Sequence, residues 1–123
     1  MATVEITQDN FNDIVEQNDI VLLDFWAEWC GPCRSFAPTY EAASEQHPDL
    51  VFGKIDTEAE QELAATFQIR SIPTIAVIRD SIMVFRQSGA LPAQALAQVI
   101  AGVRALDMDQ VRAEIAAASN SQG

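Results

Sequence analysis

The fold is decided by residues 20–33, which read IVLLDFWAEWCGPC. The first part, Ile20–Trp26, is a continuous apolar run with one acid, Asp24, inside it. Such a run, rather than an alternating pattern, is expected of a central strand that is covered on both faces. Two cysteines, Cys30 and Cys33, follow it closely. The stretch therefore predicts a buried strand that leads directly into a cysteine pair.

The cysteine pair has the spacing that a dithiol catalyst needs, with one thiol to attack a disulfide and a second to release the mixed disulfide. At the start of a helix, three-residue spacing brings both sulfurs onto one face. We expect Cys30 to be the exposed, attacking thiol, because helix N-termini favour thiolate over thiol. Cys33 lies one turn further on and is expected to be more buried and to resolve the mixed disulfide. Pro32 suits a first helical turn, and Gly31 leaves little bulk around the sulfurs.

Two other uses of a cysteine pair fit the sequence less well. A structural zinc site needs four ligands, and the chain offers two cysteines and a single histidine, His47. A purely structural disulfide would close a loop too short to restrain the unfolded chain appreciably. We therefore expect no metal and no bound cofactor, only a redox-active Cys30–Cys33 disulfide.

The composition indicates a small acidic domain. The 123 residues include 7 basic and 18 acidic side chains, which give a formal net charge of −11. The basic residues are scattered singly, so nucleic acid and anionic membranes are not expected as partners. No apolar run approaches the roughly 20 residues that cross a bilayer, and the first residues lack the pattern of a signal peptide. We therefore expect a cytoplasmic protein, in which a CxxC pair is more often catalytic than structural.

Periodicity along the chain predicts an α/β domain with a mixed sheet. Strands are expected at Thr3–Ile6, Ile20–Trp26, Leu50–Asp56, Thr74–Ile78 and Met83–Gln87. Helices are expected up to about Gln17, from the cysteine motif to about Gln46, at Glu58–Phe67, and from Pro92 to about Leu106.

Residues 25–33 resemble the active-site signature of the thioredoxin family, in its bacterial-type Trp-Cys-Gly-Pro-Cys form. The resemblance extends over about residues 3 to 106, because Asp24, Lys54, the loop 69–74 and the loop 88–90 match further positions of the family pattern. It implies a thioredoxin fold, with a central mixed sheet of about five strands flanked by helices. Ser81 departs from the pattern, since the family usually has glycine in the late hairpin turn.

Two charged residues are candidates for managing protons behind the cysteines. Asp24 is unexpected in an apolar strand, because burying an unpaired carboxylate is costly. Burial would raise its pKa and make it a base for Cys33; the alternative is a structural acid satisfied by hydrogen bonds. Lys54 is the candidate that tunes Asp24, and its alternative is a surface lysine on a strand edge.

The resemblance also implies a substrate surface around the cysteines. It suggests a cis Ile72–Pro73 bond facing the cysteines, a proline that discourages metal capture, and an Ile72 backbone that pairs with an extended substrate segment. Pro73 could instead be an ordinary turn proline. Trp26 is expected to pack beneath the site. The expected docking patch combines Trp29, Gly31, Pro32, Ile72, Gly89 and Ala90.

The chain continues beyond the region that resembles the family. We divide it into a thioredoxin domain, residues 1–106, and a helical extension and tail, residues 107–123. Asp107 can cap a helix at about Met108–Ala118, with Val111 and Ile115 as its apolar stripe and a frayed tail after it. The stripe is expected to pack on the parent domain, and a partner protein is the alternative.

The leading functional interpretation is a thiol–disulfide oxidoreductase that reduces protein disulfides and acts as an electron carrier in redox homeostasis. Family resemblance implies a flavin-containing, NADPH-dependent thioredoxin reductase as electron donor and disulfide-containing proteins as targets, with the chain acting as a monomer. Two alternatives remain open. One is a binding module that uses the fold and the C-terminal helix without redox chemistry, and the other is a net oxidant or isomerase.

Overall fold

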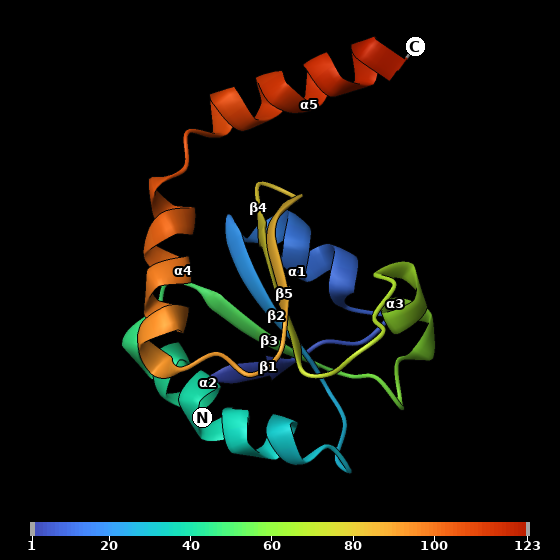
Figure 1. Ribbon diagram of the computed structural model, residues 1–123, viewed down its shortest axis with the longest axis vertical. Coiled ribbons are helices and arrows are strands. Elements are labelled where there is room, and N and C mark those ends of the chain that lie inside the picture. The colour runs from blue at the N-terminus through green and yellow to red at the C-terminus, as the bar shows by residue number, and fades with distance from the viewer. Residues whose placement is uncertain (1, 123) are drawn as a thin grey trace.

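The computed structural model describes residues 2–122, with side chains described for residues 2–119. Strands and helices alternate through the first half of the chain, and two helices end it (Figure 1). The strands are β1 (Thr3–Glu5), β2 (Ile20–Trp26), β3 (Val51–Asp56), β4 (Thr74–Arg79) and β5 (Ile82–Ser88). The helices are α1 (Phe11–Gln17), α2 (Gly31–Gln46), α3 (Gln61–Thr66), α4 (Ala93–Ala105) and α5 (Met108–Gln122).

The strands form one mixed sheet in the order β1-β3-β2-β4-β5. β1, β3 and β2 run parallel, whereas β4 pairs antiparallel with both β2 and β5. The register places Asp24 of β2 directly beside Lys54 of β3. The expected mixed sheet of five strands flanked by helices is therefore confirmed.

Helices cover both faces of the sheet, with α1 and α3 on one side and α2 and α4 on the other (Figure 1). Successive side chains of β2 point to opposite faces of the sheet. Leu22 therefore packs toward α2 and α4, while Leu23 packs toward α1 and α3. This double burial explains why the run of residues in β2 is continuously apolar. The α2–α4 layer of the core includes Phe36, Tyr40, Phe52, Leu96, Ile100 and Val103.

Asp24 lies on the same face of β2 as Leu22, because side chains two residues apart in a strand share a face. It therefore faces the α2 layer. The buried residues of α2 follow a helical spacing and line the inward side of that helix; they are Cys33, Phe36, Tyr40 and Ser44. Strand and helix together place an acid and the second cysteine of the motif on the same side of the sheet.

Helix α3 is shorter than the sequence indicates. A helix was expected over Glu58–Phe67, but α3 begins at Gln61. The carboxylate of Asp56 accepts hydrogen bonds from the backbone N–H groups of Glu58, at 2.9 Å, and Ala59, at 3.3 Å. These bonds hold the chain in a turn before the helix starts, and such side-chain bonds to nearby backbone compete with helix formation.

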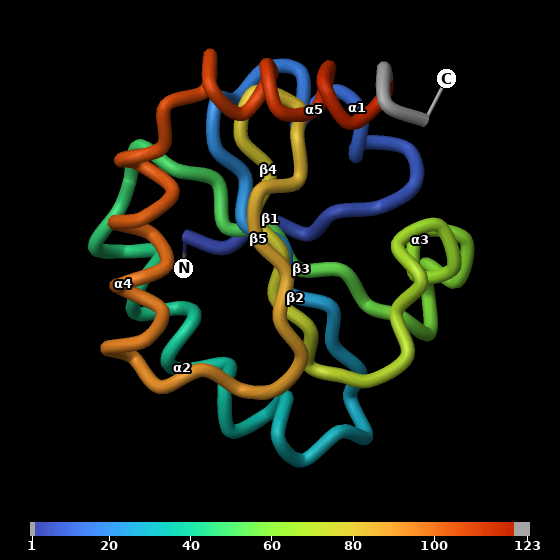
Figure 2. The backbone as a smooth tube through the Cα atoms, turned by 45° about the horizontal axis from the view of Figure 1, so that its top comes forward, coloured from blue at the N-terminus to red at the C-terminus, as the bar shows by residue number. Residues whose placement is uncertain are grey.

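Helix α5 follows α4 after two residues and crosses the end of the molecule beyond the β4–β5 hairpin (Figures 1 and 2). Asp107 caps it as expected, accepting from the N–H groups of Asp109 and Gln110. The helix runs to Gln122, so the expected end near Ala118 is wrong, and Gly123 lies outside the described residues. The expected fraying of the tail stays a prediction.

The apolar stripe of α5 packs on the domain only at its start. Met108 is 6% exposed and Val111 is half-buried, but Ile115 is 45% exposed. The expected packing of the whole stripe on the parent domain is therefore wrong for Ile115. Among the described residues, no helix is long and apolar enough to cross a membrane.

The turn between β4 and β5 contains two residues with positive φ, Asp80 at 53° and Ser81 at 65°. This is the backbone of the hairpin turns that favour glycine or asparagine, and it places a side chain where one is disfavoured. We predict that Ser81→Gly raises the free energy of unfolding by roughly 0.5 kcal/mol. Denaturant unfolding measures it. Ala101→Gly, inside α4, is the matched control and should lower stability by about 1 kcal/mol; a loss of stability in both variants would contradict the explanation.

Gly53 of β3 is packed so closely against Ile6 that no side chain fits. A Cβ atom at position 53 would lie 2.1 Å from Cδ1 of Ile6. We predict that Gly53→Ala destabilises the protein by about 1 to 3 kcal/mol, the usual cost of overpacking a core. Ile6→Val removes the clashing atom, so Gly53→Ala should cost less in that background. A double-mutant cycle of unfolding free energies measures the coupling, and strictly additive costs would contradict this account.

Candidate active site

The two cysteines form a disulfide at the start of α2, with their Cα atoms 5.2 Å apart. Cys30 is the N-cap of the helix, and Pro32 occupies its first turn, both as expected. The backbone N–H of Cys33 points at Sγ of Cys30, with 3.1 Å between nitrogen and sulfur. Once the disulfide is reduced, this N–H and the helix dipole would stabilise a thiolate on Cys30.

The expected difference in exposure between the cysteines is absent from this disulfide form, because both are only 4% exposed. The prediction of an exposed Cys30 is therefore wrong here. The reason is apolar cover, since Trp26 and Ile72 pack against the cluster that both cysteines form with Ala27. The carbonyl oxygen of Ile72 lies 3.7 Å from Sγ of Cys30.

The loop before β4 carries the expected cis peptide bond, between Ile72 and Pro73. The alternative, that Pro73 is an ordinary turn proline, is therefore wrong. The carbonyl of Pro73 accepts a 2.8 Å hydrogen bond from the N–H of Gly89, which joins the loop after β5 to the loop beside Cys30. Gly89 has a φ of 100°, a conformation that side chains rarely adopt, and Ala90 after it is exposed.

Trp29 stands out from the surface, with 67% of its side chain exposed. Its indole N–H donates a 2.7 Å hydrogen bond to the carboxylate of Glu58. No sequence pattern points to Glu58, because the contact depends on the turn that precedes α3. Trp29 and Ile72 both line a groove of about 400 Å³. Gly31 is half-buried and Pro32 is exposed at the start of the helix.

Lys54 is half-buried on β3, which lies between β1 and β2. Its interpretation as a surface lysine on a strand edge is therefore wrong. Its ammonium group lies 5.0 Å from the centre of the Trp26 ring, a cation–π contact. Lys54 and Trp26 line a hollow of about 410 Å³ together with Glu5, Asp56 and Glu60.

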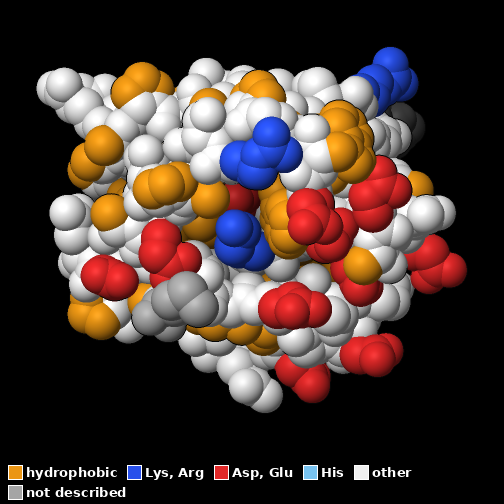
Figure 3. All heavy atoms as spheres, turned by 90° about the horizontal axis from the view of Figure 1, so that it is seen from below, with side chains coloured by type: hydrophobic (Ala, Val, Ile, Leu, Met, Phe, Trp, Pro, Cys, Tyr) orange, Lys and Arg blue, Asp and Glu red, His pale blue; other side chains and the backbone are white. Residues whose placement is uncertain are grey.

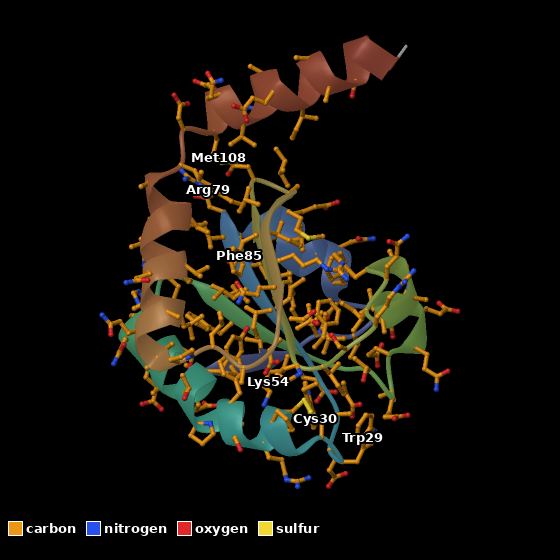
Figure 4. All side chains as sticks on the ribbon, viewed as in Figure 1. Trp29, Cys30, Lys54, Arg79, Phe85 and Met108 are labelled. Carbon is orange, nitrogen blue, oxygen red and sulfur yellow. A yellow bond between two sulfur atoms is a disulfide. The ribbon has the colours of Figure 1, made fainter. Side chains whose placement is uncertain are left out.

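The hollow around Lys54 opens at the same end of the molecule as the disulfide. Figure 4 shows Lys54, Cys30 and Trp29 together at that end, opposite Arg79 and Met108. Figure 3 views this end and shows a basic group set into the surface, with hydrophobic and acidic groups beside it. The lysine therefore has its charge at the active-site end of β3.

Asp24 is 1% exposed, and neither of its carboxylate oxygens has a hydrogen-bond partner among the described residues. The alternative of a structural acid satisfied by hydrogen bonds is therefore wrong. Desolvation by burial raises the pKa of Asp24 from 3.8 to about 7, and the charge of Lys54 opposes part of that rise. Near neutral pH this carboxyl can both hold and release a proton.

Within the described residues, no group of three or more His, Cys, Asp and Glu side chains is placed to hold a metal ion. The groups assembled at this end are instead two sulfurs, a helix N-terminus and a buried acid in the same core layer. Together with the mixed sheet and its two helical layers, they define a dithiol–disulfide oxidoreductase.

Comparison with known proteins assigns the chain to a family. Residues 2–102 match the family model described as Thioredoxin. The chain therefore belongs to the thioredoxin family, and its activity is that of a thiol–disulfide oxidoreductase.

Individual relatives agree with this assignment. The chain is 57% identical over 115 residues to putative thioredoxin 2 of Streptomyces coelicolor, which covers 94% of this chain and 86% of the relative. It is 41% identical over 104 residues to a bifunctional thioredoxin reductase/thioredoxin of Mycobacterium leprae, covering 83% of this chain and 23% of the relative. A solved thioredoxin variant from Halobacterium salinarum superimposes with a TM-score of 0.79 at 33% identity, covering 85% of this chain and 93% of that one.

The raised pKa of Asp24 predicts a pH-dependent stability. In the folded state the carboxyl of Asp24 keeps its proton up to about pH 7, whereas in the unfolded chain it loses the proton near pH 4. The free energy of unfolding of the wild type therefore falls as the pH rises between these values. Asp24→Asn removes the ionisation. Its stability relative to wild type should therefore increase from pH 4 to pH 7, by up to roughly 4 kcal/mol, and then level off.

Denaturant unfolding across this pH range tests the prediction. Glu45→Gln, which changes an exposed carboxylate of α2, is the control and should show no such growing gain. A pH-independent difference between Asp24→Asn and wild type would show that Asp24 ionises alike in the folded and unfolded chain.

Proposed function

We propose that the chain reduces protein disulfides, with Cys30 as nucleophile and Cys33 as resolving thiol. The Cys30 thiolate attacks one sulfur of the target disulfide, a mixed disulfide forms, and the other target sulfur leaves as a thiolate. Cys33, as thiolate, then attacks Cys30 Sγ and releases the second target thiolate. Two electrons pass to the target, and the Cys30–Cys33 disulfide forms. The observation that carries this assignment is the Cys33 N–H directed at Cys30 Sγ.

Asp24 is proposed as the base that accepts the proton of Cys33 during resolution. Three facts support the role: its place on the face of β2 that α2 covers, the absence of a hydrogen-bond partner for its carboxylate among the described residues, and its raised pKa. Lys54 is proposed to tune Asp24, because its positive charge favours the ionised carboxylate from the neighbouring strand. The cation–π contact with Trp26 supports that placement by holding the ammonium group at this end of β3.

The target is proposed to dock on the surface around the disulfide. An extended segment would pair with the Ile72 backbone, whose carbonyl lies beside Cys30, and this is strand addition in the sense used for peptide recognition. Pro73 shapes this loop and Trp26 supports the sulfurs from beneath. The exposed indole of Trp29 supplies apolar contact area. Gly31, Pro32, Gly89 and Ala90 complete the proposed patch.

Electrons are proposed to come from a flavin-containing, NADPH-dependent thioredoxin reductase, so that the chain works as an electron carrier between it and disulfide-containing targets. The name of the Mycobacterium leprae relative, which joins a thioredoxin reductase to a thioredoxin, supports such a pairing. A cytoplasmic, monomeric protein fits this role, because the reducing cytosol keeps such thiols reduced.

The division into a catalytic unit, residues 1–106, and an extension, residues 107–123, is also proposed. The family match ends at residue 102, and α5 contacts the rest of the chain through its first turns. No step of the chemistry needs the extension.

Variants of the two cysteines and of Asp24 test the mechanism through insulin reduction by dithiothreitol. Cys30→Ser should abolish catalysis, because no nucleophile remains. Cys33→Ser, reduced beforehand and mixed with insulin in the absence of dithiothreitol, should instead accumulate a mixed disulfide with the substrate, detected by mass. Asp24→Asn should still form the mixed disulfide at the wild-type rate but resolve it about tenfold or more slowly.

Ala101→Gly, which changes only helix propensity in α4, serves as the control for folding. A Cys30→Ser variant as active as wild type would overturn the assignment of the nucleophile. Equal resolution rates in Asp24→Asn and wild type would remove Asp24 from the mechanism without affecting the cysteines. Equilibration with glutathione determines direction, and a reductase requires a potential below that of the glutathione couple.

A further inference from the structure

A groove lies on the surface between Ile72 and α3. It begins at Ile72, whose carbonyl oxygen lies 3.7 Å from Sγ of Cys30, and its volume is about 400 Å³. The floor and walls are mainly small or apolar. The residues that line it are Trp29, Thr57, Gln61, Ala64, Ala65, Ile69, Arg70, Ser71 and Ile72. A target chain that reaches Cys30 beside Ile72 can therefore continue into this groove.

Of the described residues that line the groove, one is charged: Arg70, which comes two residues before Ile72. Arg70 is exposed, and within residues 2–119 it has no hydrogen bond or ion pair. The other basic residues all have a partner. Three arginines donate hydrogen bonds to backbone carbonyls: Arg34 to Glu28, Arg79 to Val103, and Arg86 to Phe67 and Gln68. Two arginines form ion pairs: Arg104 with Asp49, and Arg112 with Asp80 and Asp109. Lys54 makes a cation–π contact with Trp26.

An unengaged guanidinium in an apolar groove is suited to a carboxylate, because its planar fork of N–H donors can bind both oxygens. We propose that Arg70 is a specificity-determining residue, which selects targets carrying an acidic side chain close to the disulfide cysteine on the side that enters this groove. The inference rests on the proposed docking at Ile72.

The surroundings limit this preference to one position. The carboxylate of Glu58 accepts a hydrogen bond from the indole of Trp29, which lines the groove, so an acidic target residue beside Trp29 would meet a like charge. The chain as a whole carries a net charge of −11, which disfavours approach of acidic targets in general. Arg70 is therefore a local positive charge that can attract an acidic target side chain although the protein as a whole repels it. An acidic residue should help only where it can reach this guanidinium.

Single-turnover reduction of disulfide-linked peptide dimers tests the proposal. The peptides differ only in having Glu, Gln or Lys two residues before or two residues after the cysteine, and the fluorescence of the reduced protein reports its oxidation. Wild type should reduce the Glu peptide about threefold faster than the Gln peptide on one side of the cysteine only, a size typical of exposed ion pairs. Arg70→Gln should remove that difference, and Arg70→Glu should shift the preference to Lys. Added salt should weaken the wild-type preference.

Arg112→Gln is the control, because it makes the same change in net charge at the opposite end of the molecule, and it should leave the preference intact. Two results would overturn the role of Arg70: an unchanged Glu preference in Arg70→Gln, or an equal slowing of all peptides in that variant. A wild-type protein that does not reduce even the Gln peptides would instead contradict the proposed reductase function. The two failures are therefore distinguishable.

Discussion

Strand β2 is buried on both faces, and the rest of the site depends on this constraint. Because helices cover both sides of the sheet, successive residues of β2 pack into two different core layers. Burial of this kind contributes the largest favourable term in folding, and it tolerates no unpaired polar group without cost. The strand nonetheless carries Asp24, and it ends where the chain turns into Cys30 and α2. The same packing that stabilises the domain thus fixes the position of the sulfurs and isolates an acid behind them.

The cost of burying Asp24 is connected to what the site can do. An unpartnered carboxyl in the core is easier to keep protonated, so its pKa moves to about 7, the range in which proton exchange with a thiol is useful. Lys54 is held by the face of Trp26 and acts from the neighbouring strand. Helix α2 meets the opposite requirement for the first thiol, because its free N–H groups favour a negative sulfur. One site therefore combines an environment that opposes charge on a carboxyl with one that supports charge on a sulfur.

Basic groups are scarce on this acidic chain, and most of them serve the fold. Arg79 binds three carbonyls at the end of α4 and in the link to α5, and Arg86 binds the loop after α3. Arg112 joins α5 to the hairpin turn at Asp80. Against this background the unengaged Arg70 stands out in the groove beside the disulfide.

The sequence by itself determined the strands, the helix that begins at the cysteines and the mixed sheet, because these follow from periodicity and from a motif of adjacent residues. It also identified Asp24, since an acid in an apolar run is visible without coordinates. Tertiary structure alone decided that Cys30 is as buried as Cys33, because Ile72, distant in sequence, covers it. Three further features likewise arise between separate elements. They are the hydrogen bond from Trp29 to Glu58, the cation–π contact of Lys54 with Trp26, and the groove at Arg70. Such contacts depend on how the helices pack against the sheet, and no local pattern of residues determines which distant side chains that packing brings together.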